Sequence, residues 1–374
     1  MNKRKPSFYY IVFTLLLFVT IVITASVGSA NITIYDSFRV LLSRIPFVGG
    51  LIDTSQIPEN YFTIVWNIRI PRILLSGLSG ASLALVGACF QGLFRNPLAD
   101  PQILGISSGA ALGATLAALS GMTMSFFGLG VIGAFAFVGA LLTVLLVYRI
   151  AFTGSTGSVT HIVLTGTAIS SMLSAMISLL MSIRREQIEK VYMWTLGSFS
   201  AASMKKVGFL FLFFILCATI IIVYARDLNI IAAGEETAES LGIDTMKVKR
   251  VLIIVGSLLV AACVSVCGII GFVGLIIPHV VRLLLGPKHE RLLPFSCIFG
   301  AFFLIVCDTL ARTLRSPGEL PVGVITALFG APYFLLLLYY YLMFHHQQLS
   351  QMEYQPHHFF YISYLYLMIH HKLP

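Results

Sequence analysis

Charged residues are scarce in this sequence: Asp, Glu, Lys and Arg supply only 10% of its 374 residues. In soluble globular domains, about a quarter of the residues are charged. Hydrophobic residues make up 58% of the chain, and its mean hydropathy is +0.93. Exposing so apolar a surface to water would be unfavourable, so lipid must cover much of it. The composition therefore predicts an integral membrane protein and excludes a soluble globular one.

Motifs for several kinds of chemistry are absent. The sequence has no Gly-x-x-x-x-Gly-Lys-Ser/Thr phosphate loop, so any nucleotide chemistry must belong to a partner. No nucleophile stands with a credible base, and no Cys-x-x-Cys pair is present. Every cysteine lies in an apolar segment, which favours packing over metal or redox chemistry. We therefore expect no catalytic residue, no metal site and no bound cofactor in this chain. The cysteines are Cys89, Cys217, Cys263, Cys267, Cys297 and Cys307.

The formal net charge of +9 could suggest a nucleic-acid partner. The basic residues lie at the ends of apolar segments instead of clustering on one face. This distribution is typical of anchors at a membrane interface, so we expect the lipid bilayer, and no nucleic acid, as the partner of these charges.

Ten segments are candidate membrane helices, because a span needs about 20 mostly apolar residues. They are 8–29, 61–91, 97–119, 124–150, 158–182, 204–224, 246–270, 273–285, 293–312 and 320–342. The segment 273–285 is too short to cross unaided. Basic residues precede the first segment as in a signal peptide, but its long apolar run without a convincing cleavage site predicts a retained helix. The predicted fold class is all-α and polytopic, with one membrane domain over residues 1–342.

Two stripes of small residues predict close helix packing. Ser76, Gly80, Ala84 and Ala88 recur every four residues, and Gly105, Gly109 and Gly113 do the same. Such stripes allow helix backbones to approach one another in lipid. We interpret both as helix–helix seams and not as substrate sites.

The segment between these stripes predicts a sharp turn. Asn96 can cap a helix whose first residue is Pro97, a position where the missing N–H of proline costs nothing. Arg95 precedes this turn and Pro101 lies shortly after it. We therefore expect a turn at 95–97 and a helix that starts at Pro97.

A third glycine pattern predicts a broken helix. Gly268, Gly271 and Gly274 are three residues apart, and Pro278 follows them. Non-helical backbone at membrane depth survives only where protein or a wet cavity satisfies it, so interrupted spans tend to line transport pathways. His279, beside Pro278, is interpreted as a structural histidine and not as a ligand.

The hydrophilic segment 225–250 predicts a short amphipathic helix from Glu235 to Leu241. Its acidic residues lie in the first turn, where they favour the helix dipole, and Gly242 can end it. Asp244 can then cap the next span. The segment is either an ordinary solvated connection or a docking element for a partner at the membrane surface.

Several motifs together resemble a known family, the permeases of ABC importers for iron-siderophores, haem and vitamin B12. The resemblance covers roughly residues 8–340, with the motifs in the family's order, which is more specific than any single pattern. The matching motifs are Arg69-Ile-Pro-Arg72, Gly80 to Gln91, Arg95 to Gly105, Gly234 to Gly242, Gly268 to Arg282 and Glu319 to Pro332.

The resemblance implies a type II ABC importer architecture with about ten spans. It further implies a second permease copy or homologue, two cytosolic ABC ATPase subunits that bind ATP and Mg, and an extracytoplasmic substrate-binding protein. The loop that resembles the family's coupling helix would contact the ATPase. Its candidate residues are Gly234, Glu235, Glu236, Ala238, Leu241 and Gly242.

By the same resemblance, Arg69, Arg72 and Arg312 would receive acidic residues of the binding protein. Each arginine also has a structural interpretation. Arg69 and Arg72 could extend to a membrane interface, and Arg312 could pair with Asp308 one turn earlier.

The C-terminal segment 343–374 departs from the resemblance. Six of the nine histidines lie there as adjacent pairs, and its apolar run 359–369 is too short to span. Paired histidines hint at metal capture only by composition. A divergent end or a shifted reading frame is the other interpretation, and we favour it.

Three alternatives remain open at this point. An ion-coupled secondary transporter would need intramembrane carboxylates, for which Asp100 and Asp308 are the few candidates. A membrane scaffold or sensor that transports nothing is the second alternative. Within the importer hypothesis, a haem or vitamin B12 permease competes with the iron-siderophore permease that we favour, because that is the commonest role in the family.

Overall fold

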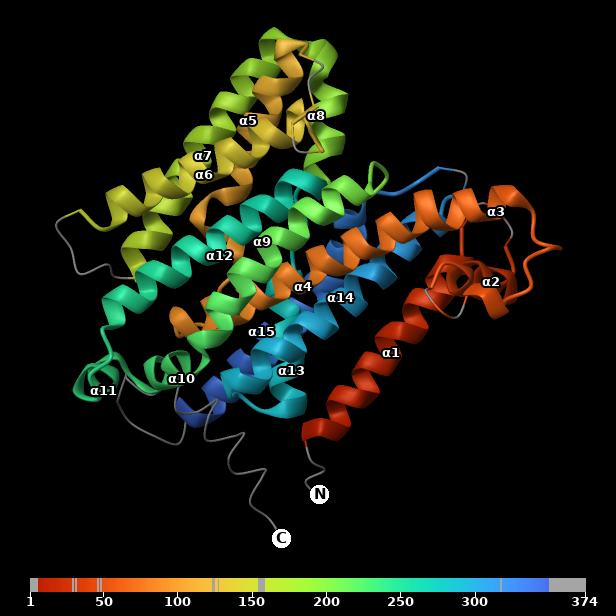
Figure 1. Cartoon of the computed structure of the whole chain (residues 1–374). Coiled ribbons are helices and arrows are strands. Elements are labelled where there is room, and N and C mark those ends of the chain that lie inside the picture. The colour runs from red at the N-terminus through yellow and green to blue at the C-terminus, as the bar shows by residue number, and fades with distance from the viewer. Residues whose placement is uncertain are drawn as a thin grey trace.

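The computed structural model describes residues 6–28, 30, 32–45, 47, 49–122, 125–126, 128–153, 159–316 and 318–349. These residues form an almost wholly helical bundle (Figure 1). In this part of the chain, eight helices are long and apolar enough to cross a membrane, and two shorter apolar helices accompany them. The prediction of ten apolar helical elements, with 273–285 as a short one, is therefore confirmed.

The long apolar helices begin and end close to the predicted segments. They are α1 (Pro6–Ser26), α4 (Ile70–Leu93), α6 (Val131–Ala151), α7 (Val159–Ile183), α9 (Met204–Val223), α12 (Thr245–Cys267), α14 (His289–Thr313) and α15 (Val322–Leu349). The short ones are α5 (Ile106–Ser120) and α13 (Val273–Leu285).

Shorter elements fill the connections. They are α2 (Ile34–Ser43), α3 (Glu59–Thr63), α8 (Ile188–Thr195), α10 (Ala225–Ala233) and α11 (Glu235–Ser240). Three 3₁₀ turns cover Gly49–Leu51, Pro101–Leu104 and Arg185–Gln187. A small antiparallel hairpin, β1 (Ser125–Phe126) and β2 (Leu129–Gly130), precedes α6. A π-helical turn, Ile64–Arg69, joins α3 to α4 in one continuous helix of 35 residues.

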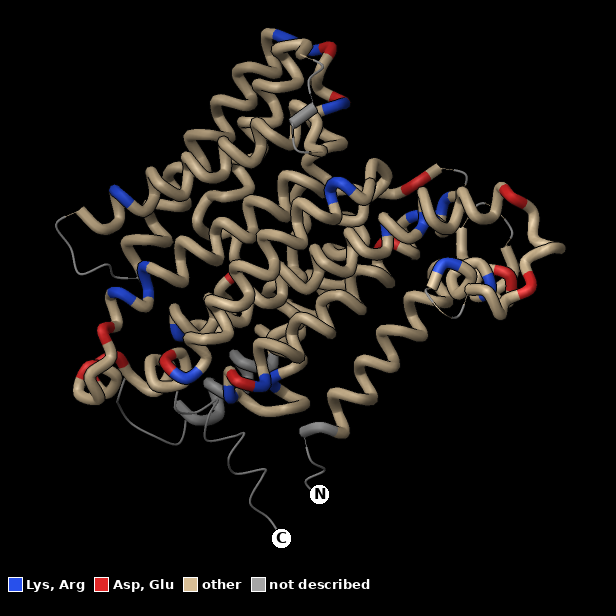
Figure 2. The backbone as a smooth tube through the Cα atoms, viewed as in Figure 1, with Lys and Arg blue, Asp and Glu red and all other residues tan. Residues whose placement is uncertain are grey.

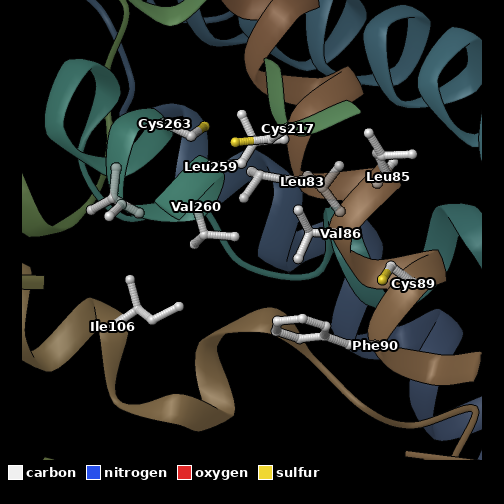
Figure 3. Packing of buried hydrophobic residues seen from close by; sticks show 14 of the residues in the cluster. Leu83, Leu85, Val86, Cys89, Phe90, Ile106, Cys217, Leu259, Val260 and Cys263 are labelled. Atoms are coloured by element: carbon white, nitrogen blue, oxygen red, sulfur yellow. The ribbon is translucent and has the colours of Figure 1, made fainter. Parts of the chain in front are cut away.

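Helix α4 forms the centre of the bundle. In its most apolar window 89% of the residues are buried, and it contacts α9, α12, α13 and α14. Side chains of α4 such as Leu83, Val86 and Phe90 pack against α12, whose Leu259 and Val260 reach toward them (Figure 3). Cysteines lie among these apolar groups, and all six are free thiols. Their predicted role as small packing residues is confirmed.

The stripes of small residues form two close seams, as predicted. On the face of α4 that meets α14, a Cβ on Gly80 would lie 2.1 Å from the carbonyl oxygen of Gly300. Between α5 and α6, a Cβ on Gly109 would lie 2.6 Å from the carbonyl oxygen of Gly139, and one on Gly113 would lie 2.1 Å from that of Phe135. Only glycine permits such backbone contact, so these positions set the spacing of the helices.

The bundle has two distinct ends. Figure 1 places α2 and α3 at one end and α10 and α11 at the other, and Figure 2 shows charged residues gathered mainly toward the ends. We call them the α2 end and the α11 end. Helix α15 runs to Leu349, beyond the predicted domain boundary at 342, and residues 350–374 of the tail lie outside the described part of the chain.

The α4–α14 seam yields a first prediction. We expect Gly80→Val to lower the unfolding temperature of the purified protein, because overpacking a tight contact typically costs about 1–3 kcal/mol. Thermal unfolding in detergent measures this effect. The matched control is Gly208→Val on α9, where a Cβ would meet no atom within 4 Å. Equal unfolding temperatures for the two variants would contradict the seam.

Candidate functional site

The α11 end carries the predicted short helix, and local sequence explains its bounds. Helix α11 covers Glu235–Ser240, one residue shorter than predicted. Gly242 adopts a left-handed conformation, with φ +82°, and its N–H donates to the carbonyl of Glu239 at 2.9 Å. The N–H of Ile243 donates to the carbonyl of Ala238 at 3.0 Å. This pair of bonds is the Schellman ending that the glycine predicts.

Helix α11 is fixed to the start of α12 through one of its sides. The ammonium of Lys249, which is buried, forms a salt bridge with Glu235, and Thr245 donates a hydrogen bond to Glu239 at 2.8 Å. Ala238 is fully buried beneath the helix. The opposite side is open, with Glu236 exposed and Leu241 66% exposed. Helix α11 therefore presents a fixed, partly apolar knob to whatever lies beyond this end.

Asn229 fixes the preceding helix, α10, to the start of α14. Its carbonyl oxygen accepts from the backbone N–H of His289 at 2.8 Å and lies 2.9 Å from Nδ1 of that residue. Its amide nitrogen donates to Glu290 at 2.7 Å. One side chain thus spans the gap between the two helices, so α10 and α11 are held to α14 as well as to α12.

A second polar group ties α4 to α13 at the same end. The amide of Gln91 donates to the carbonyls of Gly274 and Leu275 at 3.2 and 3.1 Å, and its oxygen accepts from Arg282 at 2.9 Å. Sequence pattern alone does not single out Gln91 or Asn229. The available signal is a polar amide beside an apolar span, which needs an internal partner.

The turn after α4 differs from the prediction. The predicted helix start at Pro97 is wrong: Asn96 accepts from the N–H of Leu98 in a local turn, and Arg95 has φ +51°. Asp100 caps the 3₁₀ turn that begins at Pro101, by accepting from the N–H of Gln102 at 2.8 Å. Helix α5 starts only at Ile106. Asp100 therefore caps the 3₁₀ turn and not α5, whose N-cap is Gly105 with no side-chain cap.

The predicted break near Gly268 is confirmed. Helix α12 ends at Cys267, Gly268 has φ +75°, and α13 starts at Val273 with Pro278 inside it. Protein groups satisfy the open backbone. Ser198 donates from its N–H to the carbonyl of Cys267 at 2.8 Å, and the amide of Gln102 donates to that of Ile270 at 2.8 Å.

The other glycines at the break allow close packing. A Cβ on Gly274 would lie 2.8 Å from the ring of Pro101 and 2.9 Å from the carbonyl of Leu83 on α4. A Cβ on Gly271 would have only the amide of Gln102 near it, at 4.0 Å. The break therefore rests on the turn that follows α4, which joins two motifs that lie far apart in the sequence.

The three arginines considered for docking lie at the α2 end, where they are buried. Arg69 is 3% exposed and donates to the carbonyls of Ala25, Ser26 and Ala30, at 2.7, 2.8 and 2.7 Å. Arg312 is also buried and donates to the carbonyl of Thr24 at 2.6 Å. Together their hydrogen bonds fix the last turn of α1 and the segment that follows it.

Arg72 has acidic partners inside the chain. Its guanidinium forms a bidentate contact with Asp308 of α14, with two distances of 2.9 Å, and contacts Glu319 at 2.8 Å. Asp308 therefore pairs with Arg72 and not simply with Arg312 one turn away. Internal acceptors therefore hold all three arginines in this structure. A docking role for Arg69, Arg72 and Arg312 stays a prediction.

Comparison with known proteins decides the family. The FecCD transport family matches residues 16–340. This chain belongs to that family. This chain is 44% identical over 280 residues to the cobalamin import system permease of Halobacterium salinarum, and the match covers 75% of this chain and 74% of that protein. It is 35% identical over 338 residues to the hemin transport system permease of Yersinia pestis, with 90% and 96% covered.

A solved structure agrees with the fold. It is described as an inward-facing conformation of a metal-chelate type ABC transporter, and it matches with a TM-score of 0.76 and 34% identity. The match covers 90% of this chain and 99% of that one. The chain is therefore an ABC importer permease with the type II architecture, a multi-pass protein of the cytoplasmic membrane.

The described residues include several potential metal-ligating side chains and the six thiols. Among them, no group of three or more His, Cys, Asp or Glu is placed to hold a metal ion. Cys263 and Cys267 lie 3.9 Å apart, sulfur to sulfur, as free thiols one helical turn from each other. At both ends of the bundle, the polar side chains described above link one helix to another.

The buried ion pair at the α2 end yields a second prediction. Arg72→Leu leaves the buried carboxylate of Asp308 without its bidentate partner, so we expect a loss of about 3–5 kcal/mol in stability. The double variant Arg72→Leu with Asp308→Leu should recover much of this loss. Thermal unfolding of the single and double variants in detergent gives the coupling between the two residues.

Arg39→Leu is the matched control, because Arg39 pairs at 3.9 Å with Asp53, whose side chain is 72% exposed. The side chain of Arg39 is only 17% exposed, but water screens the pair at its open partner, and such a pair is worth about 0–1 kcal/mol. If Arg72→Leu proved as mild as this control, the guanidinium would be free for another role, and the ion pair would not support the fold.

Proposed function

We propose that this chain is the membrane-spanning subunit of an importer that carries an iron-siderophore-type metal chelate into the cytoplasm. It would work with a second permease copy, two cytosolic ATPase subunits that hold ATP and Mg, and an extracytoplasmic binding protein. The observation that carries the importer mechanism is helix α11, which is fixed to α12 and, through α10, to α14, yet keeps Leu241 and Glu236 exposed.

Helix α11 has the features of a motor contact. An ordinary connection between spans needs neither a buried salt bridge such as Lys249–Glu235 nor a hydrogen-bonded link to a further helix such as that of Asn229 to α14. A knob that must transmit force needs both, because a loose loop would yield before the spans moved. On this assignment the α11 end is cytosolic, and Gly234 and Gly242 bound the element that enters the ATPase.

The exposed face of α7 supports a pathway of weak contacts for a large ligand. Thr167, Ser171, Ser174 and Ser178 recur on one exposed face of this helix. Thr167, Ser171 and Ser178 donate to carbonyls of their own helix at 2.9–3.0 Å, so these hydroxyls are already satisfied. A surface that consists of methionines and of hydroxyls that already have acceptors makes only weak contacts with a ligand. One copy offers one such surface, and a second copy would close the path.

The geometry weighs against ion-coupled secondary transport. Such a mechanism needs a carboxylate that exchanges its ion or proton during transport. The sequence of α7 carries no Asp, Glu, Lys or Arg. Of the two candidate carboxylates, Asp308 is held in a bidentate contact by Arg72, and Asp100 accepts from the N–H of Gln102 as a turn cap. Neither offers an exchangeable site along the exposed path.

The substrate class rests on relatives. Proteins of this family similar to the chain are named for hemin, ferric citrate, ferric hydroxamate, cobalamin and molybdate. Two of these five names denote ferric chelates without haem, and a third denotes an iron porphyrin. We therefore favour a ferric chelate, and a haem or cobalamin permease is the second candidate.

A third prediction tests the coupling contact. In the reconstituted importer, Leu241→Asp should abolish chelate uptake or reduce it strongly, because a charge enters the apolar contact with the ATPase, while the protein still inserts and folds. The measurement is uptake per ATP hydrolysed in vesicles. Leu314→Asp is the matched control, since Leu314 is 64% exposed at the opposite end. Normal coupled uptake by Leu241→Asp would exclude α11 as the motor contact.

A fourth prediction tests the substrate. Vesicles that contain the permease with its ATPase and binding protein should accumulate labelled ferric siderophore, and do so better than hemin or cobalamin. The three chelates are compared side by side, with an ATPase variant that cannot hydrolyse ATP as control. Uptake of cobalamin or hemin alone would refute the siderophore assignment and leave the importer mechanism intact.

A further inference from the structure

Helix α2 carries an apolar face that no part of the described chain covers. Ile34, Tyr35 and Phe38 are 56%, 68% and 37% exposed, and Ile45, just past the helix, is 43% exposed. Phe47 and Leu51 in the following turn are 100% and 84% exposed. Residues 34, 35, 38 and 45 recur at helical spacing, so they share one side of the element.

The other side of α2 is packed against the protein. Ser37 and Val40 are fully buried, and Val40 joins a small core with Ile57 and Val65. The indole N–H of Trp66 donates to the carbonyl of Val40 at 3.0 Å. Helix α2 therefore cannot rotate to hide its apolar side, and that side points away from the bundle.

Position and flanking residues identify the medium on that side. Helix α1 leads through a short segment into α2, and only 17% of the residues in the most apolar window of α1 are buried. One side of α1 packs on α14, where Tyr10 stacks on Phe295, so lipid covers the other side. Figure 1 shows α2 turned beside the end of α1 instead of continuing it. The apolar side of α2 thus lies where the lipid-covered surface of α1 meets the end of the bundle.

Arginines and aromatic rings accompany this surface, as is typical of a membrane–water interface. The guanidinium of Arg39 lies 5.2 Å from the ring centre of Tyr35, and that of Arg44 lies 5.6 Å from that of Trp66. Hydrogen bonds from Ser55 lower the pKa of Asp53, so this carboxylate stays ionised beside Arg39. Long basic side chains of this kind can reach water while their stems lie along apolar surface.

We propose that α2 is an interfacial amphipathic helix whose apolar side, with Phe47 and Leu51, lies in the lipid headgroup region at the α2 end of the protein. Such helices bury one apolar side in the boundary between headgroups and acyl chains. The lipid then holds α2 from outside, while Arg69 holds the segment between α1 and α2 from inside through the carbonyl of Ala30.

The test measures which medium surrounds Phe38. The full-length chain, with its six cysteines replaced by alanine, carries an environment-sensitive fluorophore on Phe38→Cys and is reconstituted in vesicles of phosphatidylethanolamine and phosphatidylglycerol. Lipids with a spin label near the headgroup should quench this fluorophore strongly, and aqueous iodide should quench it weakly. Gln56→Cys, an exposed position in the turn before α3, should show the opposite pattern. Leu15→Cys, 61% exposed on α1, should respond best to a spin label deep in the acyl chains.

Two results would overturn the proposal. Quenching of the Phe38→Cys label by iodide as strongly as at Gln56→Cys would place the apolar side in water. Protection from both iodide and spin-labelled lipid would mean that protein, such as a second copy of the chain, covers it. If the cysteine-free chain does not fold, Tyr35→Trp in the natural sequence replaces it, and quenching by lipids brominated near the headgroup, compared with the unmutated chain, decides in the same way.

Discussion

Polar groups inside a lipid-covered bundle must find partners within the protein, and the buried contact of Arg72 with Asp308 is the strongest instance here. It joins α4, the central helix, to α14 at two points, and the Gly80–Gly300 seam joins the same helices further along. Arg69 and Arg312 satisfy the open carbonyls at the end of α1. At the α2 end Arg72 is thus neutralised by Asp308 and Glu319, while Arg69 and Arg312 donate to backbone carbonyls, so these buried charges have partners within the chain, as an apolar surrounding requires.

Sequence pattern predicts the elements of this fold well because each depends on nearby residues. Segment 273–285 and the ending of α11 at Gly242 follow from local glycines and apolar length. The predictions fail where a contact joins residues that lie far apart in the sequence. Arg72 and Asp308 are 236 residues apart, so nothing beside either of them indicates the pairing, and all three arginines look like surface cations from sequence alone. The start of α5 fails for a different reason: Asn96 and Asp100 both accept hydrogen bonds in local turns before the helix, and α5 begins only after Gly105, which has φ +75°.

The α11 end is joined differently: beside the buried Lys249–Glu235 salt bridge between α11 and α12, amide side chains link the other helices. Asn229 links α10 to α14, and Gln91 links α4 to α13. Amide contacts of this kind contribute about 0.5–1.5 kcal/mol each, far less than breaking a buried ion pair would cost. The α4–α14 link at the α2 end is thus stronger than the amide links at the α11 end, so breaking the α10–α14 or α4–α13 link costs less than separating α4 from α14.

This difference in strength constrains how a displacement of α11 can act. Because Lys249 and Thr245 tie α11 to the start of α12, a push on α11 reaches that helix directly. Helix α12 ends at the break near Gly268, whose backbone rests on Gln102 and Ser198 through single hydrogen bonds. Helix α14 receives the same push through Asn229, but it is anchored to α4 by the ion pair at its far end. A displacement applied at α11 therefore meets its weakest resistance at the break between α12 and α13, and the glycines there are the residues that can change backbone conformation at the lowest cost.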